Sequence, residues 1–440
     1  MLYKEFDAAT TPIEGRMLLE ASAGTGKTYS LMRVLLRLLV EKGIELDRIL
    51  VVTFTNAATD ELSSRLRSNL TELIEQIRLN KSGSFNDLLD SWGEKKYSQD
   101  IILEKLQTAL NKIDDAAIFT IHGFCQRILQ DFVFSSKGNY DFEIGDDSNA
   151  KDKALSTFLR TNLPKAYPGY PTEQLSLARD IPWEDILTTA AGLSRSKPLT
   201  RQMKLMKDAN QKPEDETTRF FETFIDQATK LYEENKKDER LFTFDDLLIE
   251  AEERIVKDPE FTKAIQNLYG AALIDEFQDI NQIQYDTIRL LAAPENNLFI
   301  VGDDDQSIYR FRGARPEIML NFKKDYPEAE TVTLAENYRS VENIIRAAGK
   351  VIKNNHARYP KDIHGVREKG EPIEIHGFVN QGQENGFVLE KVREYQKKGV
   401  ALRDMAVLFR TNTAARPLVE KFMEYNIPFQ MRDSLPNIYE

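Results

Sequence analysis

The 440-residue sequence contains a single cysteine, Cys125, which excludes an intrachain disulfide and indicates a reducing compartment. Its N-terminal residues lack the apolar core of a secretory signal. The longest apolar run, from Val34 to Val40, is interrupted by Arg37 and is too short to cross a bilayer. Internal repeats and long low-complexity segments are also absent. These absences predict a soluble, cytoplasmic protein that does not bind a membrane.

Positive charge is outweighed by negative charge. The sequence has 59 Lys and Arg against 71 Asp and Glu, a net charge of −12, which argues against a wholly basic binder of nucleic acid. A local basic channel remains compatible with this balance, because electrostatic steering depends on where charges lie. With 41% hydrophobic and 30% charged residues, the composition is that of a folded chain. At about 150 residues per domain, the length predicts roughly three domains, or two with a large insertion.

Short apolar runs alternate with helical patterns along most of the chain. The sequence opens with a strand, a glycine-rich loop and a helix that ends near Gly43. Strands are expected at residues 17–20, 49–54, 117–121, 271–274, 298–301, 331–334 and 405–409. Repeated strand–helix alternation predicts an α/β fold with a parallel sheet and crossover helices.

The alternation divides the chain into regions. Residues 136–239 carry aromatic and charged residues at helical spacing with prolines between them, which predicts a mostly helical insertion. Residues 1–135 and 240–327 then form a first α/β domain. The alternation restarts at about residue 328, so 328–440 is expected to begin a second α/β domain, which has too few elements to be complete.

A phosphate-binding loop is predicted between the first strand and the first helix. The sequence ASAGTGKT matches the pattern G-x4-G-K-[ST], except that Ala21 replaces the first glycine. Small residues allow consecutive backbone N–H groups to point at phosphate oxygens, at a helix N-terminus. Lys27 is expected to reach the β- and γ-phosphates, and the Thr28 hydroxyl to bind Mg²⁺. The residues expected to line this site are Ala21, Ser22, Ala23, Gly24, Thr25, Gly26, Lys27 and Thr28.

A pair of acidic residues follows another buried strand. Asp275 and Glu276 come directly after the run 271–274, which places them at the carboxyl edge of the sheet, beside the loop. Asp275 is expected to hold Mg²⁺ through water, and Glu276 to activate the attacking water. Alone, such a pair is usually a solvated turn. Together with the lysine-bearing loop, it indicates a catalytic site.

The segment 299–314 repeats this arrangement. Gln306 follows the strand and is placed to sense the γ-phosphate. Tyr309 and Phe311 alternate with Arg310 and Arg312, so aromatic rings that stack on bases lie next to guanidinium groups that bind phosphates. A core helix with two aromatic residues is the alternative. A metal site at the acidic triplet 303–305 is disfavoured, because acidic turn residues are common.

Together, these motifs resemble the superfamily 1 helicases of the UvrD/Rep/RecB type. Four further segments are similar to motifs of that family: VVTFTNAAT at 51–59, FTIHGFCQRIL at 119–129, FTFDDLL at 242–248 and LAENYRS at 334–340. The ordered matches extend from residue 18 to about 433. The first 135 residues look most like RecB, and those after 240 look more like Rep and UvrD.

The resemblance implies a P-loop NTPase with RecA-like domains, the second incomplete, that uses ATP and Mg²⁺. Tyr338 would stack on adenine, and Arg339 would act as an arginine finger. A surface ion pair is the alternative for Arg339. The residues implied to contact DNA are Thr53, Phe54, Asn56, Thr120, His122, Phe244, Asp245, Tyr309, Phe311 and Arg312. A capping or core histidine is the alternative for His122, and a plain helix start for Phe244 and Asp245.

The basic segment 353–370 carries five Lys or Arg against two acids. It is equally compatible with an edge that tracks phosphates and with a solvated face.

The function implied by the resemblance is ATP-dependent 3′→5′ movement on single-stranded DNA, for recombination or repair. The implied partners are single-stranded DNA, duplex–single-strand junctions, and a protein that completes the motor or a helicase–nuclease complex. The family's later motifs have no match before Glu440. An ATP-gated DNA-binding subunit or a motor fragment without turnover is therefore the alternative. A phosphate-loop kinase or GTPase is disfavoured, since the guanine signature [NT]KxD is absent.

Overall fold

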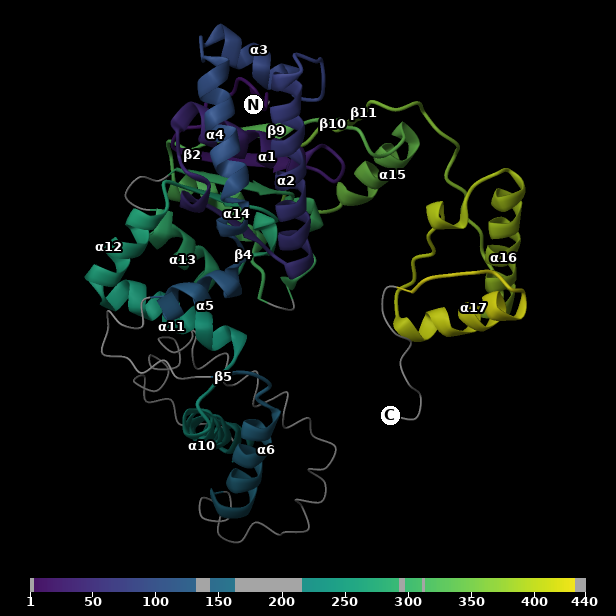
Figure 1. The fold of residues 1–440 in the computed structure, drawn as a ribbon. Coiled ribbons are helices and arrows are strands. Elements are labelled where there is room, and N and C mark those ends of the chain that lie inside the picture. The colour runs from purple at the N-terminus through teal and green to yellow at the C-terminus, as the bar shows by residue number, and fades with distance from the viewer. Residues whose placement is uncertain (1–3, 132–142, 163–215, 293–296, 311–312, 432–440) are drawn as a thin grey trace. The chain divides into compact units, whose positions relative to one another are not determined.

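The computed structural model describes residues 4–131, 143–162, 216–292, 297–310 and 313–431 (Figure 1). The chain divides into two compact units, residues 1–369 and 370–440. Across the described ranges, no helix combines the length and the apolar composition that crossing a bilayer requires.

The first unit is built on a seven-stranded sheet in which every pair of neighbouring strands is parallel. Its order is β1-β9-β2-β8-β7-β3-β4. The strands are β1 (Lys4–Glu5), β2 (Arg16–Ala21), β3 (Ile49–Thr53), β4 (Ile118–Thr120), β7 (Ala271–Ile274), β8 (Leu298–Gly302) and β9 (Glu330–Leu334). The apolar runs before residue 335 therefore form the strands expected of them. The parallel sheet confirms the predicted α/β fold.

Helices cover both faces of this sheet, because its strands are apolar on both sides. Successive residues of β2 pack into different cores: Leu18 belongs to one hydrophobic cluster and Leu19 to the other. The helices around the cluster of Leu19 are α1 (Lys27–Arg37), α2 (Asn56–Arg78), α3 (Asn86–Glu94) and α4 (Gln99–Asn111). Those around the cluster of Leu18 are α5 (Ile121–Asp131), α11 (Phe244–Lys257), α12 (Pro259–Leu268), α13 (Gln282–Ala292) and α14 (Pro316–Asp325).

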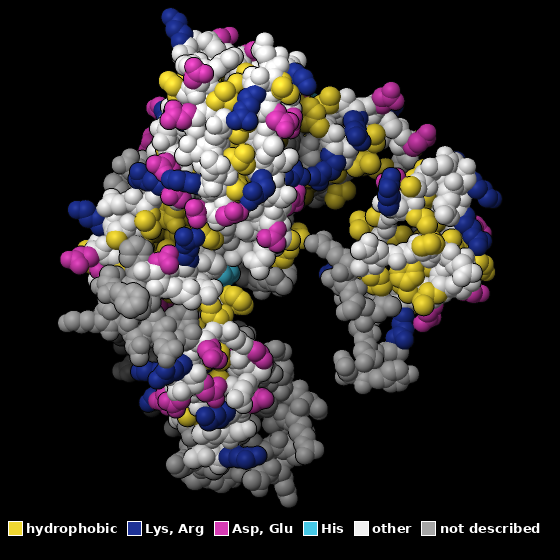
Figure 2. All heavy atoms as spheres, viewed as in Figure 1, with side chains coloured by type: hydrophobic (Ala, Val, Ile, Leu, Met, Phe, Trp, Pro, Cys, Tyr) yellow, Lys and Arg dark blue, Asp and Glu magenta, His cyan; other side chains and the backbone are white. Residues whose placement is uncertain are grey.

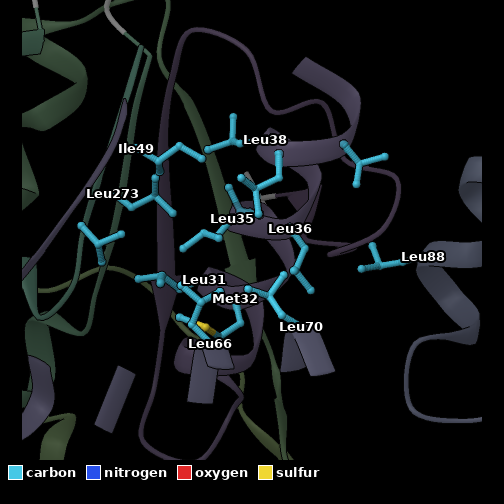
Figure 3. Packing of buried hydrophobic residues seen from close by; sticks show 14 of the residues in the cluster. Leu31, Met32, Leu35, Leu36, Leu38, Ile49, Leu66, Leu70, Leu88 and Leu273 are labelled. Carbon is cyan, nitrogen blue, oxygen red and sulfur yellow. The ribbon is translucent and has the colours of Figure 1, made fainter. Parts of the chain in front are cut away.

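The phosphate-loop helix is held rigidly in the first of these cores. Figure 3 shows side chains from α1, α2, α3 and the sheet packed together: Leu31, Met32, Leu35, Leu36, Leu66, Leu70, Leu88, Ile49 and Leu273. Leu31, Leu35 and Leu66 have no exposed surface. The helical stretch ends at Gly43, as expected, with a positive φ of 64°. A buried α1 therefore fixes the position of the loop that precedes it.

The predicted helical insertion is described only in part. Strands β5 (Glu143–Ile144) and β6 (Leu241–Phe242) pair in parallel. Helix α6 (Ser148–Thr157) packs against α10 (Glu216–Asp238). The described part is mostly helical, and residues 163–215 lie outside the described residues.

The boundary between the units falls later in the chain than residue 328. Strand β9 is hydrogen-bonded to β1 and β2 in the first sheet. The short strands β10 (Glu336–Asn337) and β11 (His364–Gly365) and helix α15 (Glu342–Ile352) also belong to the first unit. The compact division accordingly follows Lys369. Of residues 328–369, strand β9 is part of the seven-stranded sheet, whereas β10 and β11 form a separate two-stranded sheet.

The second unit contains α16 (Gln381–Lys397) and α17 (Asn412–Glu424), packed around Leu389, Val392, Leu418 and Phe422. Hydrophobic side chains, in yellow, gather on its visible face (Figure 2). The strand expected at residues 405–409 is not formed, and the described part of this unit, 370–431, contains no strand. Leu408 and Ile375 are each 93% exposed, so these two apolar side chains are not packed into a core.

Candidate functional site

The loop between β2 and α1 has the backbone shape of a phosphate cradle. Gly24 has a φ of 82° and Gly26 a φ of 98°, in the left-handed region that favours glycine. Within the described residues, no side chain caps the N-terminus of α1, so its first N–H groups are left without a side-chain acceptor. Ala21 lies in β2, paired with Leu334. The first position of the loop pattern therefore does not need glycine here, and the loop fits a phosphate group.

The lysine of the loop is paired with the second acidic residue. Lys27 Nζ lies 2.8 Å from Glu276 Oε2, and the same oxygen accepts a hydrogen bond of 2.7 Å from Gln278 Nε2. Burial tends to raise the pKa of Glu276, but Lys27 and the hydrogen bond from Gln278 outweigh it, so the pKa is lowered. Glu276 has a φ of 49°, a strained backbone that costs about 1–3 kcal/mol and is typical of functional sites. The site therefore holds an ionised carboxylate against the loop.

The first acidic residue has the opposite electrostatic character. Burial and the neighbouring charge of Glu276 raise the pKa of Asp275 to about 6, although Lys27 opposes this shift. A divalent cation would offset the excess negative charge, and carboxylate and hydroxyl oxygens are ligands that Mg²⁺ accepts. Thr28 is half-buried in the first turn of α1. The residues present therefore fit Mg²⁺.

Asn337 joins the loop to the segment that carries Tyr338 and Arg339. Its buried side chain donates a hydrogen bond of 2.6 Å to the carbonyl of Ala23 and accepts hydrogen bonds from the backbone N–H groups of Arg339 and Ser340. The N–H of Tyr338 donates to the carbonyl of Gly24 at 3.0 Å. These bonds hold the two side chains beside the loop.

The contact between this segment and the loop is close. A Cβ at Gly24 would lie 2.6 Å from Cβ of Arg339, so only glycine fits there. Tyr338 is 56% exposed, and its hydroxyl donates to Glu336, which raises the pKa of Tyr338 to about 12. Arg339 is exposed. Both side chains are thus available to a ligand bound in the loop.

The loop after β8 is connected to the acidic pair by Gln278. Gln278 Oε1 accepts a hydrogen bond of 2.9 Å from the N–H of Asp303. Asp303 in turn accepts one of 2.5 Å from Gln306 Nε2. A continuous chain of contacts therefore runs from Lys27 through Glu276 to Gln306.

Four of the ten residues expected to contact DNA form two pairs of aromatic rings. The rings of Phe54, after β3, and Tyr309, after β8, are 5.0 Å apart. The rings of His122 and Phe244 are 5.6 Å apart and nearly perpendicular, at 77°. Burial lowers the pKa of His122, although Asp245 opposes the shift. Phe244 is 61% exposed, so this pair has an accessible edge.

The other residues expected to contact DNA differ in their exposure and in their hydrogen-bond partners. Thr53 is buried, and its hydroxyl bonds to that of Thr59 at 2.7 Å, while Thr120 accepts a hydrogen bond from the N–H of Gly123. Both hydroxyls therefore have internal structural partners. Asn56 is exposed at the start of α2. Phe311 and Arg312 lie outside the described residues.

Sequence reasoning missed Asn337 and Gln278, which connect the separate motifs. Each stands inside a segment that was recognised, next to residues that were given roles. Only the folded structure shows their contacts, which for Asn337 span more than 300 positions of the sequence. The signal available in the sequence was an amide side chain between an acidic and an aromatic residue.

The parallel sheet, the glycine-rich loop before α1 and the acidic pair after β7 define a phosphate-loop nucleotide-binding protein of the α/β class. The sequence model of the UvrD/REP helicase N-terminal domain matches residues 2–327, and that of the UvrD-like helicase C-terminal domain matches 332–436. The chain therefore belongs to the UvrD/Rep helicase family. This finding confirms the resemblance noted from the sequence.

Curated relatives include the ATP-dependent DNA helicases PcrA of Staphylococcus aureus (strain Mu50) and Staphylococcus epidermidis (strain ATCC 12228). Each is 29% identical to this chain over 432 residues, which are 97% of this chain and 50% of the relative. The chain thus spans about half the length of the curated relatives it matches.

Proposed function

We propose that this chain binds ATP and Mg²⁺ and couples ATP hydrolysis to movement along single-stranded DNA, as part of an ATP-dependent DNA helicase. The observation that carries the proposal is the loop after β8. It holds Gln306, which is connected to the Lys27–Glu276 pair, and Tyr309, whose ring lies against Phe54. A change at the nucleotide can therefore act on a base-stacking surface through one short segment. The names of the relatives support this assignment.

The residues of the site divide the chemistry among them. The backbone of residues 22–28 and the ammonium of Lys27 bind the phosphates, and Tyr338 stacks on the adenine. When bound, Mg²⁺ held by Thr28 and Asp275 supplies charge neutralisation at the phosphates. The carboxylate of Glu276 orients the attacking water and takes its proton, while Gln306 and Arg339 contact the γ-phosphate. The lowered pKa of Glu276 keeps this base ionised at neutral pH.

We place the DNA-binding residues at the same edge of the sheet as the nucleotide site. Phe54 and Tyr309 stack on bases, and His122, Phe244 and Asp245 line a second part of the track. The remaining proposed contacts are Thr53, Asn56, Thr120, Phe311 and Arg312. The family resemblance supports 3′→5′ movement, duplex–single-strand junctions as substrate, and a role in repair or recombination in the cytoplasm. It also supports a protein partner that completes the motor, and the assignment of 1–135 with 240–327, 136–239 and 328–440 to separate domains.

ATP hydrolysis with and without single-stranded DNA tests the proposal. We expect DNA-stimulated turnover that Lys27→Ala abolishes, because the loop then lacks the cation that binds the β- and γ-phosphates. Lys81→Ala, at an exposed lysine beyond α2, is the matched control and should leave turnover unchanged. ATP-dependent strand binding without turnover would favour the alternative of a gated binding subunit. Absence of nucleotide binding would refute both.

Removal of one ring of the Phe54–Tyr309 pair should weaken DNA binding. Stacking contributes about 1–3 kcal/mol per base, so Tyr309→Ala should lower the affinity for single-stranded DNA about 5–150-fold. A fluorescence titration with labelled oligonucleotide measures this, and nucleotide affinity should stay unchanged. Tyr395→Ala, at an exposed tyrosine of α16, is the control. Equal DNA affinity for Tyr309→Ala and the parent would remove Tyr309 from the track.

A further inference from the structure

A buried lysine lies among four carboxylates behind the phosphate loop. Lys361 Nζ is 2.5 Å from carboxylate oxygens of Glu20, Asp303 and Asp304, and 3.1 Å from one of Asp305. The Lys361 side chain is only 3% exposed, and those of Glu20, Asp303 and Asp304 are equally or more deeply buried. Exposed ion pairs contribute little to stability, whereas the disruption of a buried pair is costly.

The residues before Lys361 hold the same loop. Arg358 donates two hydrogen bonds to Asp305, of 2.8 and 2.6 Å, and the N–H of Tyr359 donates to Asp304 at 2.7 Å. The Tyr359 hydroxyl donates to the carbonyl of Met319. The basic segment 353–370 was expected to be a phosphate-tracking edge or a solvated face. At Arg358 and Lys361 it is neither, because both side chains are turned into internal ion pairs.

The carboxylates come from two places in the fold. Glu20 stands in β2, one residue before Ala21 and the phosphate loop. Asp303, Asp304 and Asp305 stand at the start of the loop after β8, the strand next to β2 in the sheet. Asp303 also accepts the hydrogen bond from Gln306 and donates its N–H to Gln278. Lys361 therefore bridges the strand that leads into the nucleotide site and the loop that carries Gln306 and Tyr309.

The buried carboxylates around Lys361 require a nearby positive charge. Buried carboxylates this close repel each other and lose hydration, so they are tolerated only around positive charge. Oxygens of Glu20, Asp303 and Asp304 lie within 4.8 Å of one another, a spacing that would suit a metal ion. The ammonium of Lys361 stands there instead. Burial acts to lower the pKa of Lys361, but Glu20, Asp303 and Asp304 outweigh it, and the net shift is upward, so this cation is permanent.

We propose that Lys361 is a positioning residue, a fixed internal cation that locks the loop after β8 to β2 and so transmits the state of the nucleotide site to the DNA-stacking ring of Tyr309. The inference rests on the proposed function, since it specifies how that function connects its two ligands. Lys361 touches neither ligand. Its contribution is to make the loop move with the strand behind the phosphate loop, rather than independently of it.

The test is the coupling between nucleotide and DNA binding. Affinity for single-stranded DNA is measured with and without a non-hydrolysable ATP analogue in the parent, Lys361→Met, Lys361→Arg and the control Lys369→Met, at an exposed lysine of the same segment. Coupling between two sites typically changes affinity about 5–150-fold. We expect Lys361→Met to bind each ligand alone but to lose this factor, Lys361→Arg to retain part of it, and Lys369→Met to retain it fully.

Hydrogen exchange provides a second readout that does not depend on coupling. The amides of Asp303, Asp305 and Gln306 are hydrogen-bonded within the loop or to Gln278. In Lys361→Met, exchange across 303–306 should become faster while β7 stays protected. A parent chain without nucleotide–DNA coupling would refute the proposed function. Unchanged exchange at 303–306 would refute the role of Lys361, whether or not the parent shows coupling.

A double variant separates positioning from simple stability. Lys361→Met/Asp304→Asn removes a negative charge together with the cation, so it should recover thermal stability lost by Lys361→Met. It should not recover coupling, because the link between β2 and the loop is still missing. Recovery of coupling in step with stability would mean that Lys361 only supports the fold, and would overturn the proposal.

Discussion

Glu276→Gln is expected to lower the rate of ATP hydrolysis about 10²–10⁴-fold, the usual contribution of a general base. The amide keeps the shape of the side chain and can still accept a hydrogen bond from Gln278, but it cannot take a proton from water. Nucleotide binding should persist or strengthen, because Lys27 no longer has a charged partner at 2.8 Å with which a phosphate must compete. Single-turnover hydrolysis and the binding of a fluorescent nucleotide measure the two effects separately.

Glu260→Gln is the control, because Glu260 is an exposed acid at the start of α12 and has no part in the site. It should hydrolyse ATP at the parent rate. A Glu276→Gln variant that retains most of the parental rate would show that another group activates the water. Asp279 would then be the first residue to examine, since burial and Glu276 raise its pKa to about 6 and it lies in the same turn.

The loop after β8 has a central position in this molecule. On one side it contacts Gln278, and through it the Lys27–Glu276 pair; on the other it carries Tyr309 against Phe54. The ion pairs of Lys361 tie its first residues to β2. Three connections of different chemistry, an amide hydrogen bond, a ring contact and buried ion pairs, therefore meet in one short segment. Such a segment can join two binding sites without a large rearrangement of the sheet.

Much of the fold was predictable from local patterns. The strands that were expected before residue 335 are mostly buried apolar runs, and a parallel sheet covered on both faces favours this pattern. Residues 405–409 have the same pattern but form no strand. An apolar run becomes a strand only when a neighbour completes its backbone hydrogen bonds, and the described residues 370–431 contain no strand. Local sequence indicates whether a segment favours a strand, but it does not show which strand the segment would pair with.

The candidate site was likewise predictable where it depends on local sequence and not where it depends on distant contacts. Lys27, Asp275, Glu276 and Gln306 follow strand ends, and the topology of a parallel sheet brings such positions to one edge. Gln278, Asn337 and Lys361 were not foreseen, because their roles depend on contacts between segments far apart in the sequence. The amide of Asn337 bonds to Ala23, and Lys361 to Glu20. For Lys361, the basic composition of its segment even favoured an exposed position, and only packing shows that the charge is internal.

Arg339→Ala is expected to reduce ATP turnover about 10³–10⁵-fold, as the loss of an arginine finger does in related phosphoryl-transfer sites. The backbone bonds of Asn337 and Tyr338 fix this residue against the phosphate loop, so close to Gly24 that a side chain there would collide with it. Arg339 is exposed, and the proposed function places its guanidinium at the γ-phosphate. Steady-state hydrolysis with saturating single-stranded DNA measures the effect, and DNA binding without nucleotide should stay unchanged.

Arg346→Ala, at an exposed arginine of α15, is the matched control for the loss of one positive charge from the same part of the chain. It should leave turnover unchanged, whereas Arg339→Lys should remain impaired, because an ammonium cannot reproduce the planar contact of a guanidinium with phosphate. Equal turnover in Arg339→Ala and Arg346→Ala would assign Arg339 to the surface instead. Asn337 would then hold the loop in place only for Tyr338, and its replacement by alanine should weaken nucleotide binding without slowing the hydrolysis of bound ATP.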